Sequence, residues 1–441
     1  MKNVLILLFL LISKQLLATH IRGGEITYTK IRSLTYEITL KGYATISSPV
    51  KFGSGVLDLG DGTTINPPQA PSYVLTDFVN VGIYIFKTTH TYPNEGFFKI
   101  SYYEQNLDEG VVNLSNSVDT PLYIESGVFA DAALKLPALN FGCDPVLDAV
   151  MGTQVTISNA VTDTSQYLYD YQLAVPQFVQ GFRPPDSLII NSQTGLMSWN
   201  GRFQKNETPL GQYYFAVRVN QYDLASKLIG FVTRVFTIDL KEAQTSFSLT
   251  ASTSNERTLN LPPNTFKSRI ILSDSSSVDS LRFNIYFDST LKDNISFIQY
   301  DSSAKNKKIR VGLFSFTSTE QIVRNIPFNI VLRGKSYLGG FAYAAKDFSY
   351  WIFTKDSNYP IITDVVSDEV AVFPNPCSNE IFVITKAQEF NTKLFDFNGN
   401  GVLTTESVNN NRINVSSLTP GMYILILNIE GKTTRYKVIK K

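Results

Sequence analysis

The chain alternates between apolar and polar residues over many short segments, which is the pattern of β-strands. In residues 34–41 every second side chain is apolar, starting with Leu34, and the residues between them are polar. A period of two residues places one set of side chains in a core and the other set in solvent. Similar alternating or apolar runs recur at residues 82–88, 97–103, 111–114, 154–157, 187–191, 195–199, 213–219, 232–240, 269–272, 281–287, 308–316 and 326–332.

Turns rich in Gly, Pro, Asn and Ser separate these predicted strands. They include the glycine-rich residues 53–62, residues 183–186, residues 192–195 and a serine-rich loop at 273–277. Helical periodicity is scarce, and residues 131–136 form the best short candidate for a helix. Short strands between turn clusters are typical of β-sandwiches, so we predict an all-β fold built from tandem sandwich domains.

Changes in amino-acid composition and pattern along the sequence predict the domain boundaries. Residues 137–145 form a junction, and the polar residues 241–255 lead into a third region. At 441 residues the chain has room for about three ordinary domains. We expect a signal peptide at residues 1–18, sandwiches at 19–136, 137–242 and 243–356, a linker at 357–368, and a smaller sandwich at 369–441.

The first residues have the features of an export signal. Lys2 supplies a positive charge, residues 4–12 are all apolar, and Ala18 offers a small residue for cleavage. The apolar run is too short to span a bilayer, which takes about 20 residues, but it fits the core of a signal peptide. An N-terminal anchor is the alternative. No later stretch reaches spanning length, so we expect a soluble, exported mature chain.

Composition narrows the classes of function. Thirty-nine Lys and Arg against 38 Asp and Glu give a net charge of +1, which excludes a strongly basic nucleic-acid binder. The hydrophobic fraction of 43% and the charged fraction of 17% exclude a disordered chain. Cys143 and Cys377 lie in different predicted domains, so we expect two buried or half-buried thiols, with a disulfide as the alternative.

Four short motifs follow one another at the C-terminus. They are Val-Phe-Pro-Asn-Pro at 372–376, Phe-Asp-Phe-Asn-Gly at 395–399, Leu-Thr-Pro-Gly-Met-Tyr at 418–423 and Lys-Val-Ile-Lys-Lys at 437–441. The second motif ends in an Asn-Gly hairpin turn, and the third turns into a buried strand. In this order and spacing the motifs resemble the C-terminal sorting domain of the type IX secretion system. The residues that carry the resemblance are Pro374, Asn375, Pro376, Gly399, Pro420, Gly421, Tyr423 and Lys437.

This resemblance implies a route of export. Proteins with such domains leave the cytoplasm through the Sec pathway and cross the outer membrane with the type IX machinery as partner. The domain is typically removed afterwards, and many such proteins become attached to surface lipopolysaccharide. We therefore expect a location outside the outer membrane, reached through the periplasm.

A second group of motifs resembles the PKD fold, over residues 25–125. Val-Leu-Asp-Leu-Gly-Asp-Gly at 56–62 precedes Thr-His-Thr-Tyr at 89–92 and Gly-Phe-Phe at 96–98, with Leu59 in place of the family's usual aromatic residue. The resemblance implies an Asp-Gly turn, a core aromatic and a histidine that hydrogen-bonds the backbone of a nearby loop. Its residues are Asp58, Gly60, Asp61, Gly62, His90, Tyr92 and Gly96.

Two further segments are similar to bacterial surface proteins. Residues 19–28 resemble the mature start of large secreted surface proteins that carry such sorting domains. Residues 187–199 are similar to Ig-like or cadherin-like repeats. The second region nevertheless lacks the Asp-x-Asn-Asp-Asn strings expected of calcium-binding cadherins.

Residues with catalytic or metal-binding chemistry are few. His20 and His90 are the only imidazoles, and neither lies in a hydrolase motif. Zinc ligands at close spacing and phosphate-binding loops are missing from the sequence. Asp58 and Asp61 offer two carboxylates to calcium, but aspartates that form a turn are the interpretation we favour. We expect no catalytic residue, no cofactor and no metal.

The leading hypothesis is a secreted multidomain β protein of a Gram-negative bacterium that acts in adhesion or interaction without catalysis. Its ligand would be an extracellular glycan or protein, and not a nucleic acid. The alternative is a secreted hydrolase, a peptidase or glycosidase, with an active site that the motifs do not reveal.

Overall fold

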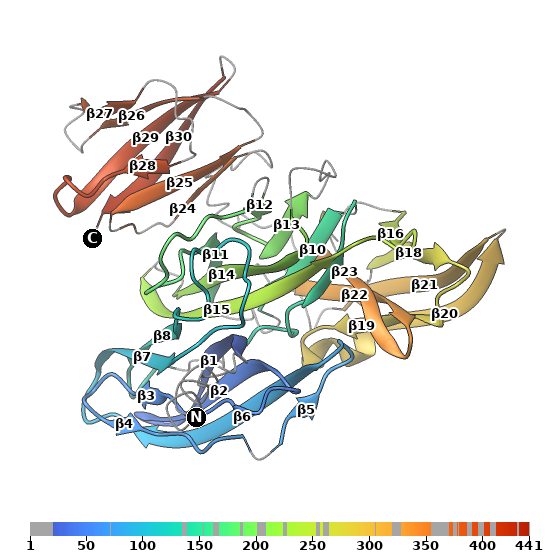
Figure 1. Cartoon of the computed structure of the whole chain (residues 1–441), viewed down its shortest axis with the longest axis horizontal. Helices are drawn as coiled ribbons and strands as arrows, with labels where there is room; N and C mark the ends of the chain where they lie inside the picture. The colour runs from blue at the N-terminus through green and yellow to red at the C-terminus, as the bar shows by residue number, and fades with distance from the viewer. Residues whose placement is uncertain are drawn as a thin grey trace, which may run out of the picture.

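The computed structural model describes residues 21–70, 72–134, 139–152, 154–161, 167–185, 188–200, 209–223, 227–252, 256–258, 264–304, 306–319, 328–353, 370–373, 377, 379–385, 390–395, 401–405, 412–429 and 432–440. Strands dominate them, and the one helical element in these ranges is a short 3-10 helix, Ser289–Asn294. The prediction of an all-β fold is confirmed (Figure 1). The predicted signal peptide and the predicted linker at 357–368 lie outside the described residues.

Twelve of the described strands form one large sheet. Its main path runs β4-β3-β7-β8-β15-β1-β2-β6-β5, and β9, β11 and β14 are attached beside it. The strands are β1 (Ile21–Arg32), β2 (Thr35–Thr45), β3 (Val56–Asp58), β4 (Thr64–Ile65), β5 (Val74–Leu75), β6 (Val81–Thr91), β7 (Gly96–Glu104), β8 (Leu122–Ala130), β9 (Asp148–Val150), β11 (Leu168–Leu173), β14 (Gly211–Tyr222) and β15 (Leu228–Lys241).

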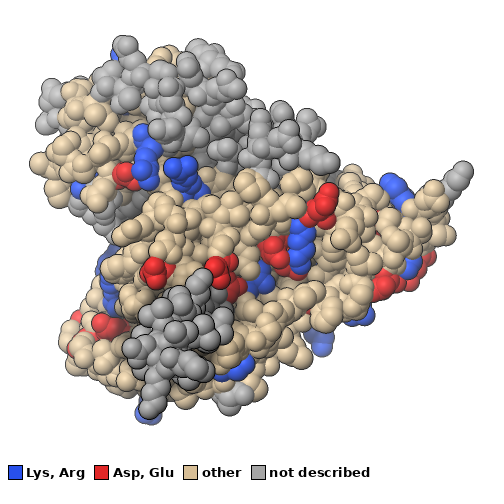
Figure 2. Space-filling view, in the orientation of Figure 1, with Lys and Arg blue, Asp and Glu red and all other residues tan. Residues whose placement is uncertain are grey.

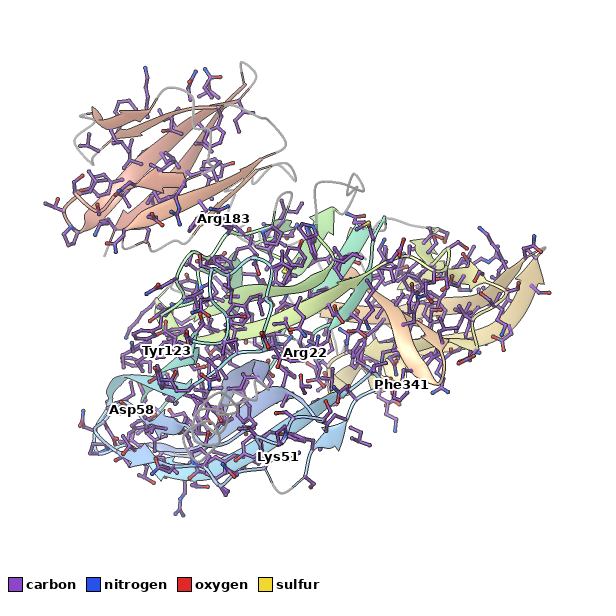
Figure 3. The ribbon with its side chains drawn as sticks, viewed as in Figure 1. Arg22, Lys51, Asp58, Tyr123, Arg183 and Phe341 are labelled. Carbon is purple, nitrogen blue, oxygen red and sulfur yellow. The ribbon has the colours of Figure 1, made fainter. Side chains whose placement is uncertain are left out.

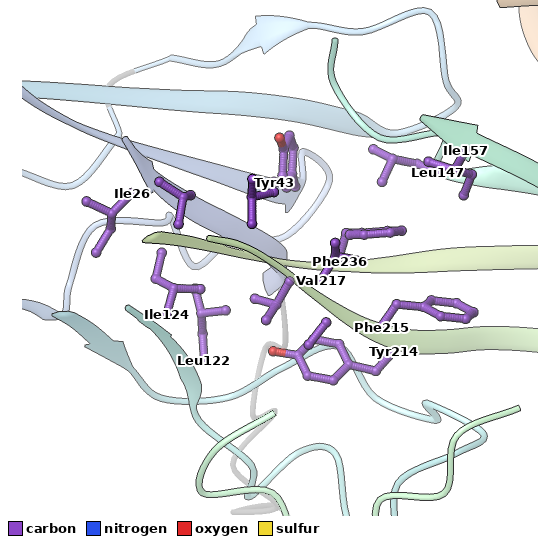
Figure 4. Packing of buried hydrophobic residues seen from close by; sticks show 14 of the residues in the cluster. Ile26, Tyr43, Leu122, Ile124, Leu147, Ile157, Tyr214, Phe215, Val217 and Phe236 are labelled. Carbon is purple, nitrogen blue, oxygen red and sulfur yellow. The ribbon is translucent and has the colours of Figure 1, made fainter. Parts of the chain in front are cut away.

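The long strand β15 joins the two halves of this sheet. It pairs with β14 along most of its length, and with β8, β1 and β9 in succession on the other side. One apolar core also extends over both halves, as Figure 4 shows for Ile26, Tyr43 and Ile124 beside Val217 and Phe236. Backbone hydrogen bonds and the apolar core therefore both connect residues before position 136 with residues after it. The domain boundary expected at residue 136 stays a proposal.

A three-stranded sheet covers part of this core. Its order is β10-β13-β12, with β10 (Gln154–Ser158), β12 (Leu188–Ile190) and β13 (Leu196–Asn200). Trp199 of β13 is fully buried, and its ring lies 4.9 Å from that of Tyr213 and 5.4 Å from that of Phe215.

Two four-stranded sheets form the third unit, which has its own core of Phe, Leu and Ile side chains. Phe314 and Tyr350 stack across it with their ring centroids 5.1 Å apart. The first sheet is β16 (Ser248–Ala251), β18 (Asn264–Ser275), β21 (Lys307–Ser318) and β20 (Ile295–Ala304), in that order. The second is β17 (Glu256–Thr258), β23 (Phe341–Phe353), β22 (Phe328–Leu338) and β19 (Ser280–Tyr286).

The C-terminal unit is a smaller sandwich that stands beside the rest of the molecule (Figure 1). One sheet is β24 (Val370–Phe373), β25 (Glu380–Thr385) and β28 (Arg412–Asn414). The other is β27 (Gly401–Thr405), β26 (Asn391–Phe395), β29 (Gly421–Ile429) and β30 (Lys432–Lys440). Its core is separate, and Phe382 contacts Phe182 of the larger unit with ring centroids 6.5 Å apart.

Three local predictions were wrong. Residues 111–114 form turns and not a strand, because the Asn113 side chain hydrogen-bonds both backbone groups of Tyr214. The described part of the expected helix, residues 131–134, is not helical, since the Asp131 carboxylate closes a turn by accepting the next backbone N–H groups. The serine-rich segment is strand up to Ser275, paired with β21.

Charged side chains of both signs are scattered over the face seen in Figure 2, as the net charge of +1 leads one to expect. Within the described ranges, no helix has the length and apolarity needed to cross a membrane.

Candidate functional site

The described residues of the predicted sorting motifs lie in the C-terminal sandwich. Gly421 begins β29, directly after Pro420, and Lys437 lies in β30 opposite Ile424. Pro374, Asn375, Pro376 and Gly399 lie outside the described residues. The first two residues of the same motif, Val372 and Phe373, are the last two residues of β24.

Tyr423 fastens the turn at the start of β29. Its ring is 6% exposed, and its hydroxyl donates to the carbonyl of Thr419 at 2.8 Å. A buried hydroxyl needs such a partner, so an aromatic residue with a polar end suits this position. Cys377 lies in an isolated bridge to Lys440, which ties the segment before β25 to the last strand.

The second predicted group, the PKD-like motif, is also brought together. Gly60 N donates to Asp58 Oδ1 at 2.8 Å, and Thr63 N donates to Asp61 Oδ1 at 3.0 Å. Both aspartates thus accept hydrogen bonds from the turn that contains them. Gly60 is required for a further reason: its φ is +88°, and a Cβ there would lie 2.6 Å from the Lys99 carbonyl oxygen.

His90 lies on β6 and reaches this turn from a distant part of the sequence. Its Nε2 is 2.7 Å from Asp61 Oδ2, with the two side chains 15% and 8% exposed. We expected a hydrogen bond to loop backbone, so that detail was wrong: the partner is a carboxylate. Burial alone would raise the pKa of Asp61, but hydrogen bonds from Thr63 and His90 lower it below its ordinary value.

Tyr92 completes the cluster as a core aromatic. It is 1% exposed, and its hydroxyl donates to the carbonyl of Leu59 at 3.1 Å. Its ring stacks on Phe98 at 4.1 Å and meets the His90 ring edge-on at 4.8 Å. Gly96 begins β7 just beyond it. The imidazole is therefore held between a carboxylate and a core ring, an arrangement that suits a structural residue.

The thiols are buried and weak as nucleophiles. Cys143 and Cys377 are both free and buried, as expected. Burial raises the pKa of the Cys143 thiol to about 11, which leaves it protonated and unreactive at neutral pH. His20 lies outside the described residues. Across the described ranges, no three His, Cys, Asp or Glu side chains are grouped so as to hold a metal ion.

The sequence pattern does not reveal the buried charged side chains. In the large sheet Lys41, Glu25 and Arg234 are cross-strand neighbours on β2, β1 and β15, and Glu25 forms ion pairs with both basic residues. Burial opposes the charge of Arg234, but Glu25 outweighs it and raises the pKa of the guanidinium. The same guanidinium lies 3.7 Å from the ring centre of Phe141.

A second buried pair joins the third unit to the larger one. Arg333 contacts both oxygens of Asp347 at 2.7 and 2.8 Å, and Asp347 also accepts from Ser158 N at 2.8 Å. Nearby, Asp77 accepts from Lys335 at 2.6 Å and from Tyr337 at 2.8 Å. Buried ionisable side chains carry no periodic signal in the sequence, because a partner can lie as far away as the 209 residues that separate Glu25 from Arg234.

The fold defines an all-β protein of several sheets, in which residues 370–440 include a small two-sheet sandwich. Residues 371–441 match the family model described as the secretion system C-terminal sorting domain. The match indicates secretion by the type IX system, and hence interaction with that machinery. The predicted location, the cell surface or the extracellular space, is thereby confirmed.

Similarity to solved structures is weak. Zebrafish RET cadherin-like domains 1 to 4 share 9% identity, with 96% of this chain and 97% of that chain covered, at a TM-score of 0.18. Titin domains z1z2 in complex with telethonin share 6% identity, with 49% and 95% covered, at a TM-score of 0.16. Scores this low support no argument about fold or function. No curated protein matches the sequence.

Proposed function

We propose that this chain is a non-catalytic interaction protein that works outside the outer membrane of a Gram-negative bacterium. The observation that carries the proposal is the match of residues 371–441 to the sorting domain. The larger part of the described chain is built of sheets joined by loops, an architecture suited to presenting a binding surface. We further propose that residues 1–18 are a signal peptide, that residues 25–125 are PKD-like, and that the sorting domain is removed after export.

The chemistry of the described residues supports a role without catalysis. His90 is engaged by Asp61, and the Cys143 thiol is buried with a raised pKa. An active site usually needs a nucleophile and a base in contact, placed where substrate can reach them. Neither group meets that requirement.

Deletion of residues 372–441 tests the export route. In a bacterium with a working type IX system, we expect the truncated protein to accumulate in the periplasm while the intact protein reaches the surface or the medium. A Lys87→Gln variant of the intact chain, changed at an exposed ion pair, is the control for expression and folding. Surface delivery of the truncated chain would contradict the assignment.

Incubation with candidate substrates tests the absence of catalysis. The purified protein should release no new amino termini from casein and no new reducing ends from soluble polysaccharides. Product formation that grows in proportion to protein concentration, and survives further purification, would favour the hydrolase instead.

A further inference from the structure

Three aromatic rings gather on the outer face of the large sheet. Tyr103 of β7 and Tyr123 of β8 are cross-strand neighbours. Phe178, from a turn far along the chain, lies edge-on to both, with ring centroids 6.1 Å from Tyr103 and 4.9 Å from Tyr123. Phe178 is 63% exposed and Tyr103 is 38% exposed. Figure 3 labels Tyr123 at the left of the larger unit, above Asp58.

The backbone of Phe178 is strained, and its ring is mostly exposed. Its φ is +59°, a left-handed conformation that bulky residues seldom adopt. Just beyond it the loop is fixed, because Ser115 N donates to the Gln180 carbonyl at 3.4 Å and Arg183 N donates to the Asn113 carbonyl at 3.0 Å. Residues held in sparsely populated conformations are concentrated at ligand clamps and functional sites. A mostly exposed ring is of little use to a core, so the strain points to a ligand.

Polar groups border the three rings. The Gln105 amide donates to the Tyr103 hydroxyl at 2.7 Å, and the Tyr123 hydroxyl lies 3.4 Å from Glu125 Oε2. The Glu125 carboxylate is held by Lys99 at 3.4 Å and by an arginine, Arg218, at 3.5 Å. Glu125 itself is 6% exposed and serves to hold the exposed Lys99 side chain in place. The Tyr103 hydroxyl, the Gln105 amide and the Lys99 ammonium therefore border the apolar surface with hydrogen-bonding groups.

A second pair of rings lies further along the same face. Phe97 of β7 is 46% exposed and stacks on Phe231 of β15 at 6.1 Å. Both rings lie over Gly127, where a Cβ would come within 2.4 Å of them. Phe97 and Tyr103 are six residues apart on one face of a strand, which separates them by about 20 Å. The face therefore has rings at both ends and polar groups between them.

We propose that this face binds an extended glycan, with the rings of Phe178 and Phe97 stacked on sugar units and the polar groups between them bonded to hydroxyls. Pyranose rings have C–H faces that pack on aromatic rings and edges that carry hydroxyls, which matches the arrangement. A stable protein partner needs about 800 Å² of contact from some 20–30 residues. Here the exposed Lys99 interrupts the apolar surface between Phe97 and Tyr103, which favours the narrower ligand. This proposal rests on the proposed function and adds the chemical class of the ligand.

Affinity electrophoresis of the intact chain tests the site. The gels contain yeast mannan, dextran, laminarin, xylan or pectin, and immobilised fibronectin and gelatin represent protein partners. We expect retention by at least one polysaccharide. The Phe178→Asn variant removes the ring but keeps a residue that tolerates positive φ, so it should fold and lose about tenfold or more in affinity. Phe178→Trp should retain binding.

Phe341 supplies the matched control. It is 47% exposed, and Figure 3 labels it far from Tyr123. Phe341→Asn should bind as the unchanged protein does, whereas Phe97→Thr should weaken binding to long polysaccharides. Equal binding by Phe178→Asn, or retention by no polysaccharide, would overturn the proposal. Binding confined to fibronectin or gelatin would overturn it too.

The failure of the site and the failure of the proposed function give different results. Release of reducing ends from a bound polysaccharide would end the non-catalytic function, while loss of binding in Phe178→Asn would still support the glycan site. Retention on a protein partner alone, unchanged in Phe178→Asn and without retention by any polysaccharide, would leave the interaction role intact and exclude the glycan site.

Discussion

Replacement of Asp347 by alanine should loosen the joint between the third unit and the rest of the molecule. The Asp347 carboxylate is fully buried, and the Arg333 side chain is 3% exposed. Two hydrogen bonds of 2.7 and 2.8 Å join them, and the same carboxylate accepts the backbone N–H of Ser158 in the neighbouring sheet. One side chain therefore connects two sheets.

The expected loss follows from the charge that is left behind. Removing one partner of a buried ion pair costs about 3–5 kcal/mol, because the remaining ion has no compensation. Burial by itself lowers the pKa of Arg333, but the Asp347 carboxylate raises it well above the ordinary value. An arginine side chain does not release its proton to escape burial, so the guanidinium stays charged in the variant. Ser158 N–H also loses its acceptor, and the two costs overlap.

Urea unfolding followed by tryptophan fluorescence measures this loss. Asp347→Ala should lower the unfolding free energy by about 3–5 kcal/mol. The control is Glu37→Ala, which breaks an ion pair of 2.8 Å with Lys87 whose side chains are 38% and 56% exposed. Exposed pairs contribute about 0–1 kcal/mol, so this variant should change little.

A double variant separates charge from packing. Arg333→Met combined with Asp347→Leu removes both ions and keeps apolar volume, so it should recover much of the stability lost in Asp347→Ala. If Asp347→Ala were no less stable than Glu37→Ala, the buried pair would contribute nothing to the joint. If the double variant were as unstable as the single one, the damage would come from Ser158 and not from the uncompensated charge.

Two predictions concern the turn at residues 58–62. His90→Ala should lower the melting temperature, since loss of the hydrogen bond to Asp61 costs on the order of 1–3 kcal/mol, and ligand binding should persist while the domain is folded; unchanged melting with lost binding would make His90 functional. The folded-state pKa of Asp61 is lowered from 3.8, so its contribution to stability is complete above the unfolded pKa and is lost as the pH falls through the folded pKa. Lowering the pH from 3.8 through the folded-state pKa should therefore reduce the unfolding free energy of the protein more than that of its Asp61→Asn variant. Equal pH dependence of the two proteins would refute the role of Asp61.

Strand positions could be predicted wherever one face of a strand is wet. In β2 the apolar set Tyr36, Ile38 and Leu40 is fully buried, and Lys41 and Glu37 on the other face are only half-buried. Alternation reports the difference between core and solvent, so it is strong in such strands. Local reasoning of this kind also applies to the sorting motifs, because their turns depend on residues that are close in sequence.

The same reasoning fails for strands covered on both faces. In β14 the sequence pattern places Phe215, Val217 and Val219 on one face and Ala216, Arg218 and Asn220 on the other. The two sets do alternate, but every member except the half-buried Arg218 is buried. Trp199 of the three-stranded sheet packs on Phe215, and the loop at Asn113 is hydrogen-bonded to Tyr214 of the same strand. Which neighbours cover a strand is decided by tertiary contacts that a local pattern does not contain.

Contacts over long sequence distances set the limit of prediction at the candidate sites. Asp58 and Asp61 could be assigned to a turn because their N–H partners are two residues away. The partner of His90 could not be assigned, because the sequence does not show which oxygen atom of the distant turn lies next to the imidazole ring. The aromatic surface is a still stronger case: Phe178 comes from a loop without periodicity, and it reaches Tyr103 only because β15 draws the two halves of the large sheet together. A composite surface of this kind is a product of topology, so substitutions in β15 that part the halves should disperse it even where every ring is kept.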